Sequence, residues 1–102
     1  MDILNEQVFE QKLKKEEVLL VDFWAPWCGP WRMLTPTMNK LQEQYPNNIL
    51  KVNVDKMQSL ASRYGVKGIP NVTIIKNGVV QESMQGVQPS HIYEEKLKYY
   101  LS

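Results

Sequence analysis

The chain alternates short apolar segments with segments whose apolar residues fall on one side of a helix. Four segments rich in Val, Ile, Leu and Phe are predicted as strands: 18–24, 49–55, 71–76 and 79–84. Four others are predicted as helices: 5–15, 30–45, 58–64 and 89–101. The first strand, 18–24, is nearly continuously apolar, which is typical of a strand buried on both faces.

Local signals set the ends of these elements. Asn5 is a predicted N-cap, Pro89 opens the last helix, and Asn77-Gly78 between two apolar runs predicts a hairpin. Pro36 lies inside the second helix and is expected to kink it. The inward-facing helix residues are expected to be Phe9, Leu13, Met33, Leu34, Met38, Leu41, Ile92, Leu97, Tyr100 and Leu101. Whether Ile3 and Leu4 add an edge strand is left open.

This order of elements predicts an α/β fold in which helices sandwich a central mixed sheet. With 102 residues, of which 43% are hydrophobic, we expect one domain, 1–102, with a single core. The formal net charge is +1 and no long block of one charge occurs, so neither a nucleic acid nor a membrane is an expected partner. No signal segment is evident and one cysteine cannot form an internal disulfide, which favours the cytoplasm.

The chain's only cysteine, Cys28, lies in the run Trp-Ala-Pro-Trp-Cys-Gly-Pro-Trp at 24–31. This run resembles the Trp-Cys-Gly-Pro-Cys redox motif of the thioredoxin family, with Trp31 where that family has its second cysteine. Two more landmarks follow in the order of that family. Gly68-Ile69-Pro70 resembles its cis-proline loop, and Asn77-Gly78 followed by Gly86-Val87 resembles its final hairpin and glycine loop.

The resemblance implies a thioredoxin fold and a protein thiol–disulfide oxidoreductase without cofactor or metal. It implies disulfide-containing proteins as substrates, and a thioredoxin reductase as partner of a dithiol parent. The attacking species is a thiolate, and the start of the predicted helix at Pro30 favours negative charge on Cys28. We expect the N–H of Trp31 to reach the sulfur. Without a second thiol, Cys28 should be less activated than in a dithiol relative.

A carboxylate within the apolar strand 18–24 should be buried and costly, so Asp22 needs an explanation. In the family, the corresponding aspartate moves protons to and from the second cysteine, and a lysine that Lys51 resembles is its partner. The alternative is a purely structural carboxylate that is stabilised by a lysine or by water. Both interpretations stay open for Asp22, and the structural one is favoured for Lys51.

Substrate binding is also implied by the resemblance. A cis bond before Pro70 would leave the backbone of Ile69 free to pair with an extended substrate segment. Trp27, Ile69 and Val87 are expected to form an apolar rim around Cys28, beside Gly29 and Pro30. Trp24 is assigned to the core, and His91 to the solvent-exposed start of the last helix.

Three hypotheses account for Trp31. The chain is a thioredoxin that has lost its resolving cysteine and stalls at the mixed disulfide with its substrate. Alternatively, it is a monothiol enzyme that external glutathione resolves, or a non-catalytic module that binds a protein partner through its apolar rim. In each case we expect a monomer, which Cys28 could join into a dimer. A large indole at this position should cause local repacking without loss of the fold.

Overall fold

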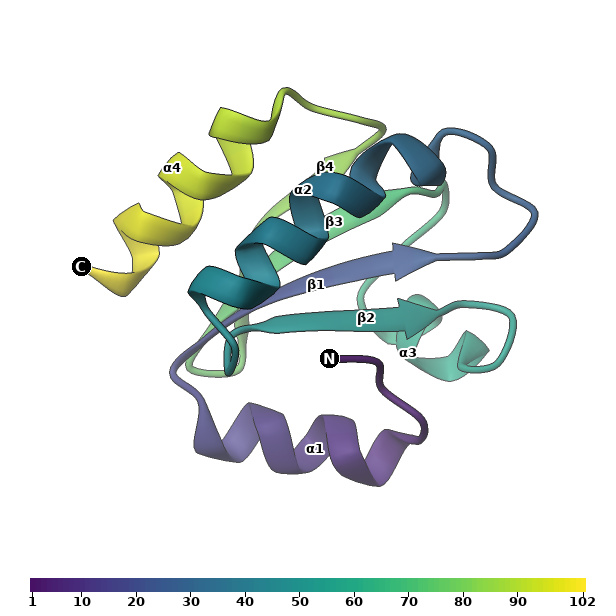
Figure 1. The fold of residues 1–102 in the computed structure, drawn as a ribbon. Coiled ribbons are helices and arrows are strands. Elements are labelled where there is room, and N and C mark those ends of the chain that lie inside the picture. Colours follow the sequence, from purple (N-terminus) through teal and green to yellow (C-terminus); the bar gives the residue numbers. More distant parts are fainter.

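The computed structural model describes residues 1–102 and contains the eight predicted elements in the predicted order (Figure 1). They are α1 (Glu6–Lys15), β1 (Val18–Trp24), α2 (Trp31–Gln44), β2 (Ile49–Asn53), α3 (Gln58–Arg63), β3 (Asn71–Lys76), β4 (Val79–Gln85) and α4 (Ser90–Leu101). The strands form one mixed sheet in the order β2-β1-β3-β4. β1 pairs with β2 in parallel and with β3 in antiparallel orientation, so the predicted fold class is confirmed.

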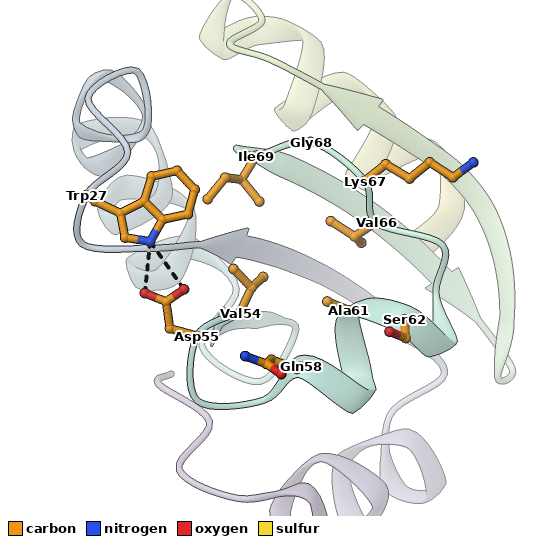
Figure 2. A pocket seen from close by; sticks show the side chains of 10 residues that line it. All are labelled: Trp27, Val54, Asp55, Gln58, Ala61, Ser62, Val66, Lys67, Gly68 and Ile69. Carbon is orange, nitrogen blue, oxygen red and sulfur yellow. Dashed lines mark hydrogen bonds between the residues drawn. The ribbon is translucent and has the colours of Figure 1, made fainter.

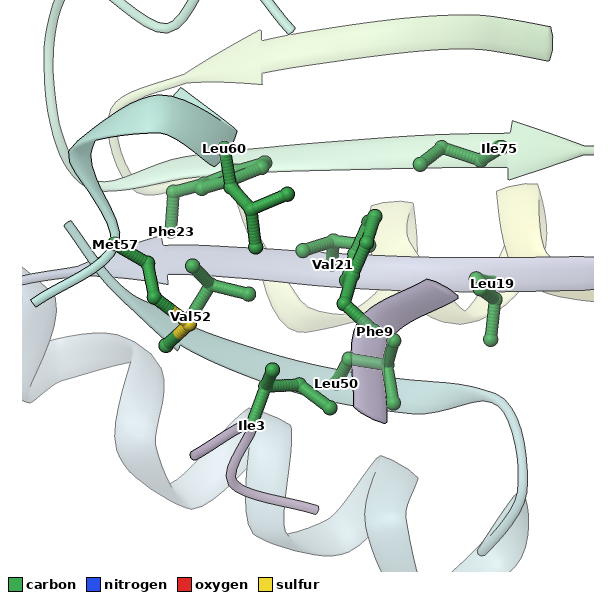
Figure 3. Close-up of a cluster of buried hydrophobic side chains, with 10 residues drawn as sticks. All are labelled: Ile3, Phe9, Leu19, Val21, Phe23, Leu50, Val52, Met57, Leu60 and Ile75. Atoms are coloured by element: carbon green, nitrogen blue, oxygen red, sulfur yellow. The ribbon is translucent and has the colours of Figure 1, made fainter. Parts of the chain in front are cut away.

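Helices cover both faces of the sheet, with α2 and α4 on one side and α1 and α3 on the other (Figure 1). Alternate residues of β1 serve these two layers because successive side chains of a strand point to opposite faces. Leu19, Val21 and Phe23 pack into the cluster on the side of α1 and α3, with Phe9 and Leu60 (Figure 3). This explains why β1 is apolar along nearly its whole length.

The opposite cluster contains Val18 and Leu20 of β1 together with residues of α2 and α4. Asp22 and Trp24 continue that alternation toward the end of β1 and therefore face the layer of α2. The register places Asp22 between Lys51 of β2 and Val72 of β3. A carboxylate is thus buried in the middle of the sheet, below the start of α2.

Most of the predicted boundary signals are confirmed. The side chain of Asn5 accepts a hydrogen bond from the N–H of Val8 at 2.9 Å, as an N-cap does. Asn77 and Gly78 both have positive φ angles, 52° and 77°, as a two-residue hairpin loop requires. β2 ends at Asn53, two residues earlier than expected, because the Asn53 side chain accepts the N–H of Asp55 at 2.9 Å and turns the chain.

Two expectations about buried residues were wrong, and one buried residue was missed. Met33 is 71% exposed and Leu101 is 40% exposed, whereas Tyr93, which was not expected in the core, is fully buried. Residues 2–4 add no strand: Asp2 forms only an isolated bridge to Lys51. The N–H of Ile3 nevertheless bonds the Lys51 carbonyl at 2.9 Å, which brings the Ile3 side chain into the core.

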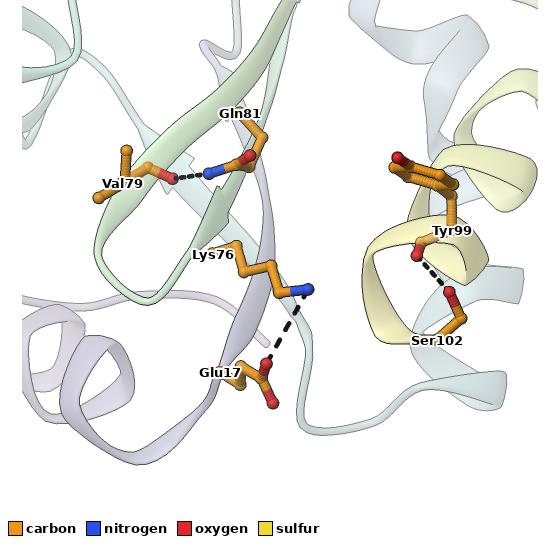
Figure 4. Close-up of polar contacts among 6 residues, drawn as sticks. All are labelled: Glu17, Lys76, Val79, Gln81, Tyr99 and Ser102. Carbon is orange, nitrogen blue, oxygen red and sulfur yellow. Dashed lines mark hydrogen bonds and ion pairs between the residues drawn. The ribbon is translucent and has the colours of Figure 1, made fainter.

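The hairpin end of the sheet lies opposite the end of β1 that leads to Cys28, since Lys76 pairs with Val18 at the start of β1. Figure 4 shows polar contacts near this end of the sheet and at the end of α4. Lys76 Nζ lies 4.0 Å from Glu17 Oε1, and the Gln81 amide donates to the Val79 carbonyl at 3.2 Å. At the end of α4, the Ser102 hydroxyl donates to the Tyr99 carbonyl at 2.6 Å. None of the helices has the length and hydrophobicity that crossing a bilayer would require.

Candidate active site

Cys28 lies in the loop that links the carboxyl end of β1 to the start of α2. Its N–H donates to the Ala25 carbonyl at 3.1 Å, which closes a tight turn, and the residue is only 5% exposed. The neighbours Gly29 and Pro30 are exposed. Cys28 is therefore almost entirely covered, while the residues that follow it in the loop are open to solvent.

The first turn of α2 does not hydrogen-bond the sulfur. The N–H groups of Arg32 and Met33 donate to the carbonyls of Gly29 and Pro30, each at 3.1 Å. The expected hydrogen bond from the Trp31 N–H to the Cys28 sulfur is absent. The N–H of Trp31, the first residue of α2, has no backbone partner, and the helix dipole also favours negative charge at this end.

The Trp31 side chain is folded back against β1. Its indole Nε1 donates to Asp22 Oδ2 at 3.1 Å, and its ring stacks on Trp24 with centroids 4.3 Å apart and an angle of 17° between planes. Trp31 also packs against the core cluster between the sheet and α2. The expected repacking thus has a definite form, in which the indole is a specific donor to the one carboxylate buried in the sheet.

Asp22 is fully buried, and its second oxygen, Oδ1, has no hydrogen-bond partner. Burial raises the pKa of this carboxyl from 3.8 to about 6, against the opposing effects of the Trp31 hydrogen bond and of Lys51. The expected partnership with Lys51 is weak, because no ion pair joins the two and Lys51 Nζ instead donates to Asn39 of α2 at 3.0 Å. Lys51 acts on Asp22 only through its charge.

A groove with a volume of about 450 Å³ runs between Trp27 and the segment around α3 (Figure 2). Trp27 is 69% exposed, and its Nε1 donates to both carboxylate oxygens of Asp55, at 2.9 and 3.2 Å. Ile69 lies on the facing side of the groove (Figure 2). The sequence analysis did not identify Asp55 or Gln58 as site residues. Asp55 could have been found, because it follows β2 at the sheet edge where β1 also ends.

The peptide bond between Ile69 and Pro70 is cis, as predicted. The N–H and C=O of Ile69 make no hydrogen bond within the chain. Val87 is 36% exposed in the loop that follows β4, and the Tyr93 hydroxyl accepts the N–H of Gln88 in that loop at 2.8 Å. Trp27 and Ile69 therefore meet across one groove, whereas Val87 does not line it.

Two further residues were assigned from the sequence, His91 to solvent and Trp24 to the core. His91 is exposed on the first turn of α4. Trp24 packs against Trp31, although its own Nε1 is buried without a partner. The fold brings together no group of three or more His, Cys, Asp or Glu side chains that could hold a metal ion.

Comparison with known proteins gives one consistent result. The thioredoxin family profile matches residues 1–98. A thioredoxin from Porphyra purpurea is 37% identical over 103 residues, covering 94% of this chain and 96% of that protein. A chloroplastic M-type thioredoxin from Pisum sativum is 36% identical over 104 residues, covering 99% of this chain but only 60% of its own length.

The fold agrees with solved structures of the same group. A mutant thioredoxin from Halobacterium salinarum superposes with a TM-score of 0.92 at 31% identity, covering 100% of this chain and 90% of that one. Mitochondrial thioredoxin 3 from Saccharomyces cerevisiae superposes with a TM-score of 0.85 at 28% identity, covering 97% and 93%. Sequence and architecture agree along nearly the whole chain, and the protein belongs to the thioredoxin family.

Proposed function

We propose that this protein is a thiol–disulfide oxidoreductase in which Cys28 attacks disulfides of protein substrates and residues 1–102 act as one domain. The observation that carries the proposal is the placement of the only cysteine. It lies at the carboxyl end of the central strand, directly before α2 and next in sequence to Trp27, which lines the groove. A substrate disulfide can approach from that side.

The first half of the reaction needs one sulfur only. The Cys28 thiolate bonds to one substrate sulfur, the substrate S–S bond breaks, and the other substrate sulfur leaves as a thiolate. The second half needs a thiol that attacks the new bond. Since Trp31 stands three residues after Cys28, where the family has that thiol, the reaction stalls at the mixed disulfide.

Protein substrates bind, in this proposal, as extended segments along the loop before β3. The unpaired N–H and C=O of Ile69 supply main-chain hydrogen bonds, as in recognition by strand addition. Trp27 and Ile69 supply apolar contact along the groove, and Val87, Gly29 and Pro30 extend the contact on the other sides of Cys28. A groove of about 450 Å³ accommodates a few side chains of such a segment.

The roles of Asp22 and Lys51 follow from the altered site. Asp22 accepts the hydrogen bond of the Trp31 indole, and the positive charge of Lys51 favours the ionised form of Asp22. We place the protein in a reducing compartment such as the cytoplasm, as a monomer that Cys28 can link into a dimer. A thioredoxin reductase would be the partner of the dithiol parent.

The test is intact mass under non-reducing conditions after the protein is mixed with a disulfide peptide. We expect an adduct of one peptide chain on Cys28, and no adduct with Cys28→Ser. In Trp31→Cys the adduct should disappear within the mixing time, and reduced peptide should form instead, because the second thiol completes the cycle. Met33→Ala, an exposed substitution in the same helix turn, should behave like the unchanged protein.

Absence of any adduct would contradict the proposal. It would favour a non-catalytic module that binds proteins through Trp27 and Ile69. The observations that favour this second function are the low exposure of Cys28 and the binding of the Trp31 indole to Asp22. A peptide that binds equally to the protein and to Cys28→Ser, without covalent attachment, would establish it.

A further inference from the structure

The loop that follows β4 is held by one buried tyrosine of α4. Tyr93 is fully buried, and its hydroxyl accepts the N–H of Gln88 at 2.8 Å and donates to the carbonyl of Gly86 at 3.4 Å. Gly86 and Gln88 flank Val87 and are half-buried, whereas Val87 itself is exposed. The hydroxyl therefore binds the loop on both sides of Val87, and Val87 stays open to solvent between the two contacts.

The same loop is bonded to the loop that leads into β3. The N–H of Gly86 donates to the carbonyl of Pro70 at 2.9 Å. Gly86 has a φ angle of 83°, a left-handed conformation that glycine adopts at little cost. A series of hydrogen bonds thus runs from Tyr93 through Gly86 to Pro70, the residue after Ile69. The position of Val87 relative to Ile69 therefore depends on the Tyr93 hydroxyl.

The hydroxyl is the only hydrogen-bond partner of the Gln88 N–H. Without it, this half-buried N–H would be left unpaired next to the core, which costs free energy. The loop could recover a hydrogen bond from water only by moving outward, away from α4. Such a movement would displace Val87 relative to Ile69, although the fold of the sheet and helices would be retained.

We propose that Tyr93 is a positioning residue for substrate binding, whose hydroxyl holds Val87 where an extended peptide paired with Ile69 contacts it. The proposal rests on the proposed function, since the peptide pairs with Ile69 while its disulfide reacts with Cys28. None of the hydrogen bonds of Tyr93 reaches Cys28, so Tyr93 acts only through the loop. Its effect therefore depends on the substrate: a peptide disulfide contacts the loop, whereas a small disulfide without a peptide backbone does not.

The experiment compares two disulfides on the purified protein: the disulfide-linked dimer of a peptide with one cysteine, and hydroxyethyl disulfide. With either, the Cys28 thiolate bonds to one sulfur, the S–S bond breaks, and the other sulfur leaves as a thiolate. The rate of adduct formation is followed by intact mass after quenching with acid. The quantity to compare between variants is the ratio of the peptide rate to the small-disulfide rate.

Tyr93→Phe should slow the reaction with the peptide and so lower this ratio about three- to tenfold, the range that loss of one hydrogen bond gives. Tyr99→Phe is the control on the same helix, because Tyr99 is 71% exposed, and its ratio should equal that of the unchanged protein. Unfolding of a variant would be recognised by a faster reaction with the small disulfide, since Cys28 is only 5% exposed in the folded protein.

Val87→Ala tests the loop without a change in the core, because Val87 is exposed. In the unchanged protein it should slow the reaction with the peptide, since it removes apolar contact. In Tyr93→Phe the same substitution should have little further effect, because Val87 is already displaced there. Such non-additivity is expected of two residues that act through one contact.

Three outcomes would overturn this inference while leaving the proposed function intact. They are an unchanged ratio in Tyr93→Phe, an unchanged peptide rate in Val87→Ala, and additive effects of the two substitutions. The result for Val87→Ala decides whether the loop contacts the peptide even if Tyr93→Phe does not fold. Absence of any peptide adduct on the unchanged protein would instead refute the proposed function, and the inference with it.

Discussion

At the scale of single residues, the contact between Trp31 and Asp22 distinguishes this chain. A buried carboxylate is costly unless it is paired, and here one indole N–H is its only hydrogen-bond donor. One donor does not offset the loss of water, so the pKa of Asp22 rises to about 6 in the folded protein. Asp22 therefore opposes folding when it is charged.

Stability should fall as the pH rises through the range in which Asp22 ionises. Between pH of about 4 and 6 the folded state binds more protons than the unfolded state, because its Asp22 pKa lies above the ordinary value of 3.8. A shift of about two units corresponds to about 3 kcal/mol of unfolding free energy at neutral pH. Asp22→Asn should remove this dependence and be more stable than the unchanged protein at neutral pH.

Urea unfolding of both proteins at several pH values checks this prediction. The quantity to compare is the difference in unfolding free energy, because other carboxyls titrate equally in both. Glu82, whose pKa is lowered by Lys96 and Tyr100, is one of these. A difference that stays constant across the range would show that Asp22 does not titrate there.

At the scale of elements, α4 shows where periodicity misleads. The pattern pointed to Ile92, Leu97, Tyr100 and Leu101, whereas the fully buried residues are Tyr93 and Leu97. A tyrosine can be buried when its hydroxyl finds a partner, and Tyr93 OH accepts the Gln88 N–H at 2.8 Å. This contact ties α4 to the loop that carries Val87, and no spacing rule could have revealed it.

Tyr93→Phe should destabilise the protein although the ring stays buried. The change removes the acceptor of the Gln88 N–H, and an unpaired group of this kind costs about 1–3 kcal/mol. Tyr99→Phe is the matched control, because Tyr99 is 71% exposed and its hydroxyl makes no hydrogen bond. Denaturant titration should show a lower midpoint only for Tyr93→Phe, and equal midpoints for both variants would contradict the prediction.

At the scale of the whole molecule, the sheet separates two apolar clusters of ten buried residues each. One cluster lies toward α1 and α3 and contains Ile75 of β3, and the other lies toward α2 and α4 and contains Ile49 of β2 (Figure 3 shows the first). β1 lies between these two strands. The two isoleucines therefore lie on opposite faces of the sheet and on strands that are not adjacent.

Changes in the two clusters should be additive. Ile49→Val and Ile75→Val should each cost about 0.5–1.5 kcal/mol through the lost methylene. The double variant should lose the sum to within about 0.5 kcal/mol, because sites separated by two strand spacings rarely couple. Chemical denaturation of the four proteins tests this, and a larger deviation from the sum would mean that the sheet transmits packing changes between its faces.

Much of the fold could be predicted because its signals are local. The apolar run 18–24, the cap at Asn5 and the turn at Asn77-Gly78 each depend on neighbours in sequence, and the structure confirms all three. Exposure at helix surfaces was predicted less well, since Met33 proved 71% exposed. Whether a helical side chain is covered depends on what packs against the helix, and that contact comes from distant parts of the chain.

The amino-acid sequence by itself determined that one cysteine follows the central strand, that a tryptophan stands three residues later, and that the family is that of thioredoxin. Tertiary structure alone decided what the tryptophan does. Asp22 is nine residues before Trp31, yet the indole meets its carboxylate at 3.1 Å because β1 runs beneath the start of α2. Likewise Trp27 meets Asp55, 28 residues away, because parallel β1 and β2 end at the same edge of the sheet. The sequence specifies which side chains are present and where along the chain they stand, whereas packing between elements decides which side chains contact each other.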